Sequence, residues 1–178
     1  MSEQELWAEI RNLKHTVQEL HGERRYMESV NRDIFAMYET NTASAMTNND
    51  YTLIDYEDKV VDTHNCVTVG AAWKYTCLKT GYYDCSASMA LATNVGWTVG
   101  ETAQVHLYKN GANNRLLGRS VAFDNGGGAS VIMGASGSGT VYCVPGDYLQ
   151  FYCFQNSGGN INLLATAITC WCSIWCRN

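Results

Sequence analysis

The sequence predicts a mainly β protein, an antiparallel jelly-roll sandwich preceded by an N-terminal α-helical coiled coil. Apolar residues near the N-terminus recur with the seven-residue period of a coiled coil. After residue 40 that period stops, and short runs rich in β-branched and aromatic residues alternate with turn sequences. Turns spaced about 8–12 residues apart are typical of sandwiches and jelly rolls.

The coiled-coil prediction rests on a seam whose steps alternate between four and three residues. A helix with such a narrow apolar stripe is expected to bury it against copies of itself. An amphipathic helix packed on the chain's own core is the alternative. Ile10, Val17 and Asn31 occupy a positions of the heptad, and these residue types favour a coiled coil of two helices. The seam consists of Leu6, Ile10, Leu13, Val17, Leu20, Arg24, Met27, Asn31, Ile34 and Tyr38.

Charge divides the chain into two parts. Residues 1–39 hold five Lys/Arg and eight Asp/Glu, whereas residues 40–178 hold seven and nine. The second part therefore has far fewer charges than the roughly 25% usual in soluble domains. A net charge of −5 and the lack of a basic cluster argue against a nucleic-acid partner.

The sequence gives no sign of membrane insertion or of an export signal. It has no run of about 18 apolar residues, the length that a membrane-spanning helix needs. The acidic start Met1–Glu5 lacks the basic and apolar regions of a secretory signal. We therefore expect synthesis in a cytoplasm, with action outside it as part of a particle.

Eight cysteines at irregular spacing leave three interpretations open. They are small buried hydrophobic residues, disulfides formed after release into an oxidising medium, or ligands of a zinc site. The zinc interpretation is the weakest because the spacing Cys170-x-Cys172-x3-Cys176 contains no CxxC pair.

The predicted organisation is a coiled-coil stalk over residues 1–39, a linker over 40–52 and a β head over 53–178. Tyr82–Thr93 alternates between apolar and polar residues, as a strand with one buried face does. Asn110-Gly111 is a strong hairpin signal. The glycine- and serine-rich segment 134–139 is expected to be a flexible loop. Further strands are expected at 53–62, Cys66–Gly70, Trp73–Leu78, Thr102–Tyr108, Leu116–Phe123, Ala129–Gly134, Thr140–Val144, Tyr148–Gln155 and Ile161–Trp175.

Three segments of the head resemble the C1q and tumour-necrosis-factor family. They are Lys79-Thr-Gly-Tyr-Tyr-Asp-Cys-Ser-Ala, Val105-His-Leu-Tyr-Lys-Asn-Gly and Gly139-Thr-Val-Tyr-Cys-Val-Pro-Gly-Asp-Tyr-Leu-Gln-Phe, in family order and spacing over about residues 70–175. The resemblance implies a ten-stranded jelly roll that forms a homotrimer. It also implies that Gly146 and Asp147 have structural roles in the turn between two strands. The closing segment, Thr169–Cys176, departs from the family pattern.

No arrangement of residues predicts catalysis, a metal site or a cofactor. The segment 134–139 lacks the Gly-x-Ser-x-Gly spacing, and Gly126–Gly128 precedes a strand rather than a phosphate-binding helix. Trp97 lies in the loop-like stretch Asn94–Gly100 and is the aromatic residue best placed to be exposed. Beside Asn and Thr side chains it would suit contact with a sugar.

These observations predict a non-enzymatic homotrimeric fibre or spike protein of a virus, most simply a bacteriophage. Its stalk would bind other virion proteins, and its head would bind a host surface glycan or protein, or decorate the capsid. A secreted C1q-like recognition module acting outside the cell is the alternative. A polysaccharide depolymerase is a third, weaker possibility.

Overall fold

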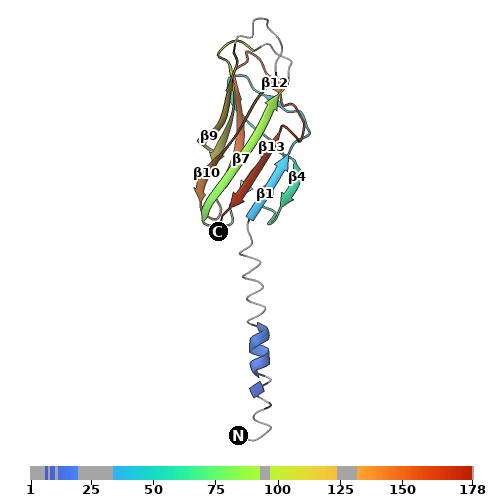
Figure 1. The fold of residues 1–178 in the computed structure, drawn as a ribbon, viewed down its shortest axis with the longest axis vertical. Coiled ribbons are helices and arrows are strands. Elements are labelled where there is room, and N and C mark those ends of the chain that lie inside the picture. Colours follow the sequence, from blue (N-terminus) through green and yellow to red (C-terminus); the bar gives the residue numbers. More distant parts are fainter. Residues whose placement is uncertain are drawn as a thin grey trace. The chain divides into compact units, whose positions relative to one another are not determined.

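A computed structural model describes residues 7, 9–10, 12–19, 34–92, 97–123 and 132–177. The chain divides into two compact units, and Ile34–Arg177 forms the larger one. In the smaller unit, the described residues 7, 9–10 and 12–19 are helical (Figure 1). Among the described residues, no helix is long and apolar enough to cross a membrane.

Ile34–Arg177, the head, is built from strands. They are β1 (Ile34–Glu39), β2 (Ala45–Met46), β3 (Asp50–Leu53), β4 (Asp58–Asp62), β5 (Val67–Thr68), β6 (Lys74–Thr76), β7 (Gly81–Leu91), β8 (Thr102–Lys109), β9 (Ala112–Val121), β10 (Met133–Cys143), β11 (Tyr148–Gln155), β12 (Ile161–Asn162) and β13 (Trp171–Cys176).

Twelve of these strands, all but β3, form two five-stranded sheets and one short pair. The first sheet has the order β10-β7-β13-β1-β4, and the second has the order β5-β6-β11-β8-β9. Strands β12 and β2 form the pair. All named strand pairs are antiparallel, and neighbours in a sheet are mostly distant in sequence, as in a jelly roll.

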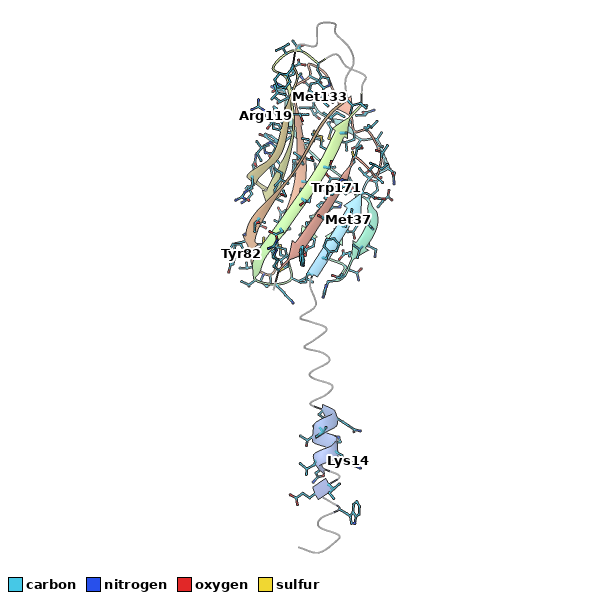
Figure 2. The ribbon with its side chains drawn as sticks, viewed as in Figure 1. Lys14, Met37, Tyr82, Arg119, Met133 and Trp171 are labelled. Atoms are coloured by element: carbon cyan, nitrogen blue, oxygen red, sulfur yellow. The ribbon has the colours of Figure 1, made fainter. Side chains whose placement is uncertain are left out.

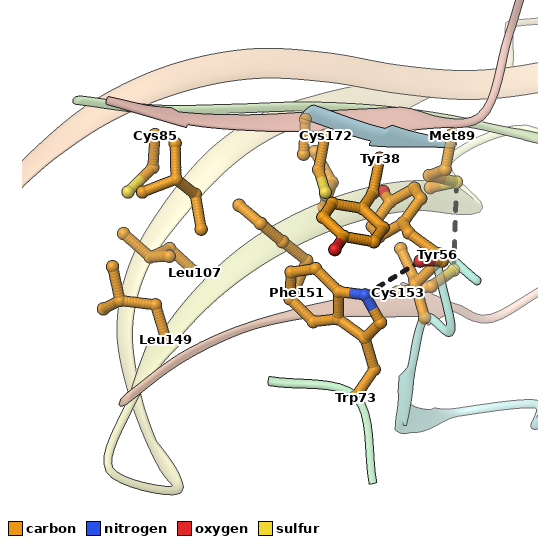
Figure 3. Packing of buried hydrophobic residues seen from close by; sticks show 14 of the residues in the cluster. Tyr38, Tyr56, Trp73, Cys85, Met89, Leu107, Leu149, Phe151, Cys153 and Cys172 are labelled. Carbon is orange, nitrogen blue, oxygen red and sulfur yellow. Dashed lines mark hydrogen bonds between the residues drawn. The ribbon is translucent and has the colours of Figure 1, made fainter. Parts of the chain in front are cut away.

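The core lies between the two sheets and contains a cluster of large rings (Figure 3). Trp73, Tyr56 and Phe151 are fully buried, with ring centroids 5.7–6.0 Å apart. The indole Nε1 of Trp73 donates a 2.9 Å hydrogen bond to the carbonyl oxygen of Tyr56. This bond satisfies the polar atom of a ring that would otherwise be costly to bury.

Strand β10 runs without interruption through residues 134–139, so the flexible loop predicted there is wrong. Its glycines let β9 approach very closely. A Cβ on Gly137 would lie 2.0 Å from the carbonyl oxygen of Leu117, and one on Gly118 would lie 2.2 Å from that of Ser136. Glycine in this segment therefore marks a close contact between backbones rather than a loop.

The predicted end of the coiled coil at residue 39 is also wrong. Residues Ile34–Glu39 form strand β1, which pairs with both β13 and β4 in the first sheet. Ile34 and Tyr38 are 2% and 4% exposed and belong to the core of the head. They therefore line no helical seam. Both residues fit the heptad spacing because residues four apart share one face in a strand as well as in a helix.

The predicted linker over 40–52 and the predicted start of the head at residue 53 need the same correction. The head begins at Ile34, and the linker region contains β2 and most of β3. Met46 in β2 is 1% exposed. The buried Gln155 donates from Nε2 to the carbonyl oxygen of Met46 at 3.1 Å. These residues are part of the head because their backbone and side chains bond to its second half.

Candidate functional site

The outer face of the first sheet carries a block of serines. In β7 the side chains of Cys85 and Ala87 are buried, so alternation along the strand turns Ser86 and Ser88 outward. Strand register pairs Ser136 with Ser88, and Ser138 with Ser86, which in turn pairs with Ser173 of β13. We call Ser86, Ser88, Ser136, Ser138 and Ser173 the serine face. Because these side chains are small, the middle of the sheet's outer face carries no large side chain at these five positions.

Large apolar side chains surround the serine face. Tyr82 and Tyr142 are 63% and 49% exposed, and their ring centroids lie 5.4 Å apart. Trp175 is 41% exposed. Met37 of β1 pairs with Ser173, and Trp171 pairs with Ser88. Figure 2 labels Met37, Trp171 and Tyr82 on this sheet. Exposed apolar rings around a flat polar centre are typical of a surface that contacts another protein.

A hollow of about 310 Å³ lies at one end of the serine face. Asp84 lines it and forms a 2.5 Å ion pair with the Nε atom of Arg177. Thr140 donates from Oγ1 to Asp84 Oδ1 at 2.7 Å. The Arg177 guanidinium lies 5.5 Å from the ring centroid of Trp175, a cation–π contact. The two opposite charges pair with each other, so this hollow carries little net charge.

A second hollow of about 340 Å³ lies beside Ser88 and Ser136. Arg119 of β9 and the 88% exposed Ile168 contribute to its lining. Ser120 fixes β9 here by donating a hydrogen bond to the carbonyl oxygen of Gly134. The face therefore has a raised apolar residue beside a concave region, and a second protein surface could interlock with such a shape.

The polar groups that line the two hollows are mainly hydroxyls and one ion pair. The hydroxyl groups lie beside the paired Asp84 and Arg177, and the described residues that line the two hollows include no histidine. Within the described ranges, no three His, Cys, Asp or Glu side chains gather as possible metal ligands.

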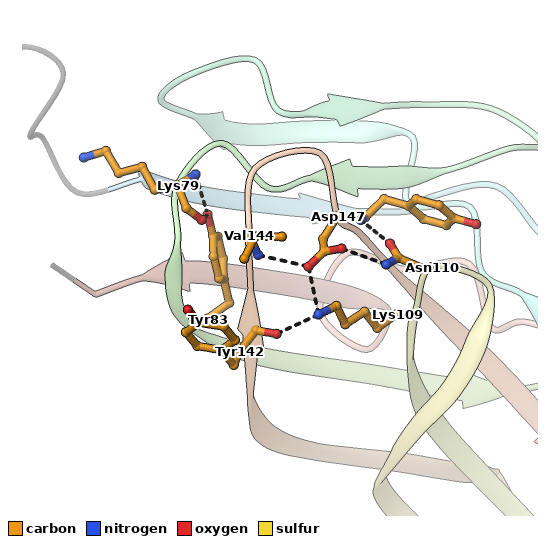
Figure 4. Close-up of polar contacts among 8 residues, drawn as sticks. Lys79, Tyr83, Lys109, Asn110, Tyr142, Val144 and Asp147 are labelled. Atoms are coloured by element: carbon orange, nitrogen blue, oxygen red, sulfur yellow. Dashed lines mark hydrogen bonds and ion pairs between the residues drawn. The ribbon is translucent and has the colours of Figure 1, made fainter.

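The turn between β10 and β11 holds the two residues that the resemblance singled out (Figure 4). Gly146 has φ +91°, a conformation that favours glycine. The Asp147 carboxylate accepts from the backbone N–H of Val144 at 2.9 Å and from Asn110 Nδ2 at 2.7 Å, and it lies 2.8 Å from Lys109 Nζ. These bonds lower its pKa to about 2, the Asn110 bond most strongly. Asp147 therefore ties this turn to the β8–β9 hairpin.

Trp97 does not lie free on the surface, as its loop-like sequence led us to expect. It is partly buried and packs against the core. Its indole Nε1 is buried without a hydrogen-bond partner among the described residues. The placement gives no support to Trp97 as a ligand-contacting residue.

All eight cysteines are buried and unpaired, as the first of the three interpretations expected. Burial raises the pKa of the Cys66 thiol to about 11. The Cys66 thiol is therefore a poor nucleophile and a poor metal ligand at neutral pH.

The predicted coil seam is partly visible. Ile10, Leu13 and Val17 lie in the described helical residues, where Leu13 and Val17 are 60% and 49% exposed. Leu6, Leu20, Arg24, Met27 and Asn31 lie outside the described residues.

Sequence reasoning missed the serine face. Its signal was present in β7, where Tyr82, Asp84, Ser86 and Ser88 alternate with apolar residues. The partner serines of β10 were hidden because Gly134–Gly139 resembled a loop. Only the register of the sheet brings the two sets together.

No protein-family model matches the chain, and no curated protein matches it in sequence. Solved structures do match its fold. Eiger TNF from S. frugiperda has a TM-score of 0.60 at 11% identity, covering 82% of this chain and 93% of that one. Murine APRIL has a TM-score of 0.56 at 12% identity, covering 82% and 100%. The PRD1 vertex protein P5 has a TM-score of 0.53 at 17% identity, covering 82% and 96%.

These matches confirm the predicted C1q/tumour-necrosis-factor-like jelly roll. Identities this low establish the fold alone. The coiled coil, the trimer and any role in a particle stay predictions.

Proposed function

We propose that this protein is a non-enzymatic homotrimeric fibre or spike of a virus particle, most simply of a bacteriophage. The observation that carries the proposal is the order of the chain. A helical segment whose Leu13 and Val17 are exposed precedes, in the sequence, a jelly-roll head that shares its fold with the phage vertex protein P5. The head would bind a host surface or decorate the capsid, and the helix would attach it to other virion proteins.

The serine face is our candidate for the contact between heads. Its uncharged centre, the exposed rings of Tyr82 and Trp175 and the two hollows suit burial against a second copy. We take the number of copies to be three, because the resemblance in sequence to the tumour-necrosis-factor family implies a trimer and the fold agrees with that resemblance. In that assembly each head would cover part of its neighbour's first sheet.

The helix also favours association into a trimer. Ile10, Leu13 and Val17 line one apolar hollow along it. In a single helix these side chains stay in water. Burying an aliphatic side chain contributes about 1.5–3 kcal/mol, so three helices that cover their seams would stabilise the trimer formed by the heads.

Purified particles test the proposal directly. The producing virus is banded by density, and the protein is sought by mass spectrometry and by immunogold labelling. We expect it in the particle band at a copy number divisible by three. Its absence from particles that contain their other structural proteins would contradict the proposal.

The alternative of a secreted recognition module is favoured by one finding, the fold shared with Eiger TNF and APRIL. It predicts free protein in the medium of producing cells and none in particles. The same fractionation therefore separates the two proposals.

A further inference from the structure

A cluster of aromatic rings covers part of the outer face of the second sheet. Tyr51 of β3 lies with its ring centroid 4.9 Å from His106, 5.1 Å from Phe154 and 5.9 Å from Tyr108. Tyr108 stacks on Tyr152 at 4.0 Å with 28° between the ring planes. We call Tyr51, His106, Tyr108, Tyr152 and Phe154 the tyrosine patch. It joins three strands, β3, β8 and β11, into one ring surface.

The patch faces solvent and offers unused hydrogen-bonding groups. Tyr51 is 39% exposed, and Tyr108, Tyr152 and Phe154 are half-buried. The hydroxyls of Tyr51, Tyr108 and Tyr152 make no hydrogen bond to any described residue. Packing of the rings on one another holds them in place, so a ligand would meet surfaces that are already ordered.

His106 fixes the amide groups at the edge of the patch. It is 5% exposed, and Asn113 donates from Nδ2 to its Nδ1 at 3.2 Å. Since Nδ1 accepts, the imidazole carries its proton on Nε2 and donates to Gln104 Oε1 at 2.9 Å. Burial lowers the pKa of His106, so the ring is neutral at pH 7. The amide oxygen of the exposed Asn113 accepts no hydrogen bond from a described residue.

A carboxylate lies beside the patch. Its tyrosine and phenylalanine side chains carry no formal charge, and the carboxylate of Asp50, which precedes Tyr51 on β3, interacts electrostatically with Tyr108. A carboxylate can accept a hydrogen bond from a hydroxyl group but repels a sulfate or a carboxylate. Flat rings, neutral donors and acceptors and one nearby carboxylate together complement an uncharged polyhydroxylated ring.

We propose that the tyrosine patch binds neutral hexose-containing glycans. The apolar C–H face of a pyranose would lie on the rings of Tyr108 and Tyr51, and its hydroxyls would bond the Tyr hydroxyls, Asn113 and Asp50. The inference rests on the proposed function, for which it supplies the ligand class of the head. It concerns the second sheet, whereas the serine face lies on the first.

The test uses the full chain on an array of neutral oligosaccharides built from hexoses, N-acetylhexosamines and deoxyhexoses, with sulfated and sialylated glycans as anionic probes. We expect binding to neutral members only. The best neutral glycan is then titrated calorimetrically against Tyr108→Ala and Tyr51→Ala, and each variant should bind about tenfold more weakly because it loses a stacking ring.

Phe123→Ala is the matched control. Phe123 is an 83% exposed ring that makes no ring contact with the patch, and its removal should leave the affinity unchanged. Circular dichroism checks the fold of each variant. The Tyr51 variant keeps the test decisive if the Tyr108 variant does not fold.

Several results would overturn the inference. They are no binding to any neutral glycan, a preference for anionic glycans, or equal affinity of the patch variants and the wild type. Capture of a protein from host envelopes stripped of glycans, with no glycan binding, would show that a protein partner uses the surface instead. None of these results affects whether the protein is found in particles, so this inference and the proposed function can fail separately.

Discussion

Replacing Ser136 with arginine tests the role assigned to the serine face. Ser136 is exposed on β10 opposite Ser88, and its side chain makes no hydrogen bond to a described residue. Arg119 lines the same hollow, and among the described residues of its lining there is no carboxylate, so a new guanidinium there would meet no ionic partner from that part of the chain. In an isolated head the substitution should change the free energy of unfolding by about 0.5 kcal/mol or less, as for most surface substitutions.

The expected effect on the trimer is much larger. If a neighbouring head covers Ser136, the arginine becomes an uncompensated buried charge, which costs about 3–5 kcal/mol. That cost corresponds to roughly a thousandfold weaker association. Light scattering during size-exclusion chromatography, over a range of protein concentrations, measures the change as a shift from trimer to monomer.

Two controls make this result specific. Ser136→Ala keeps the face small and should keep the trimer. Thr68→Arg introduces the same side chain at an exposed position of β5 in the second sheet and should also keep it. A fully trimeric Ser136→Arg protein, at concentrations where the wild type begins to dissociate, would refute the assignment of this face.

Three further predictions concern the fold of the head. Gly137→Ala should destabilise it by about 3 kcal/mol in urea unfolding, because the new Cβ would meet the Leu117 carbonyl oxygen at 2.0 Å, whereas Gly159→Ala, with nothing within 4 Å, should not. The Asp147 carboxylate has a folded pKa of about 2, below its ordinary value, so it stabilises the head above about pH 4 and that stabilisation is lost between about pH 4 and 2. Asp147→Asn should flatten this part of the stability–pH profile, and an unchanged profile would contradict the assigned pKa. A chain that starts at residue 49 lacks β1 and should fail to fold by circular dichroism, while one that starts at residue 33 should fold.

Local sequence signals predicted the strands that follow simple rules. The alternation that begins at Tyr82 predicted β7, which ends at Leu91, and Asn110-Gly111 forms the turn between β8 and β9. Both turn residues have positive φ, 52° and 77°, as the Asn-Gly signal requires. In such segments the residue types alone determine the local conformation.

Strand β1 could not be separated from the helix by spacing alone. Ile34 and Tyr38 fit the heptad seam, and only Ala36 between them, also buried, distinguishes a strand from a helix. The pairing of β1 with β13 decides the outcome, and β13 lies at the other end of the chain.

The two candidate surfaces depend on contacts that no local pattern contains. Tyr51 lay in a predicted linker, yet it packs on rings from β8 and β11. Ser136 lay in a predicted loop, yet it pairs with Ser88. Both surfaces arise from the order of strands in the sheets, which turn signals and alternation do not specify.

The solution mass of the full chain and of the chain starting at residue 33, each with and without reductant, tests the central claim most directly. We expect three copies of both chains in both conditions, since the head carries the proposed contact and its eight cysteines are unpaired. A head that is monomeric or dimeric on its own would contradict the account, because the serine face would then make no trimer.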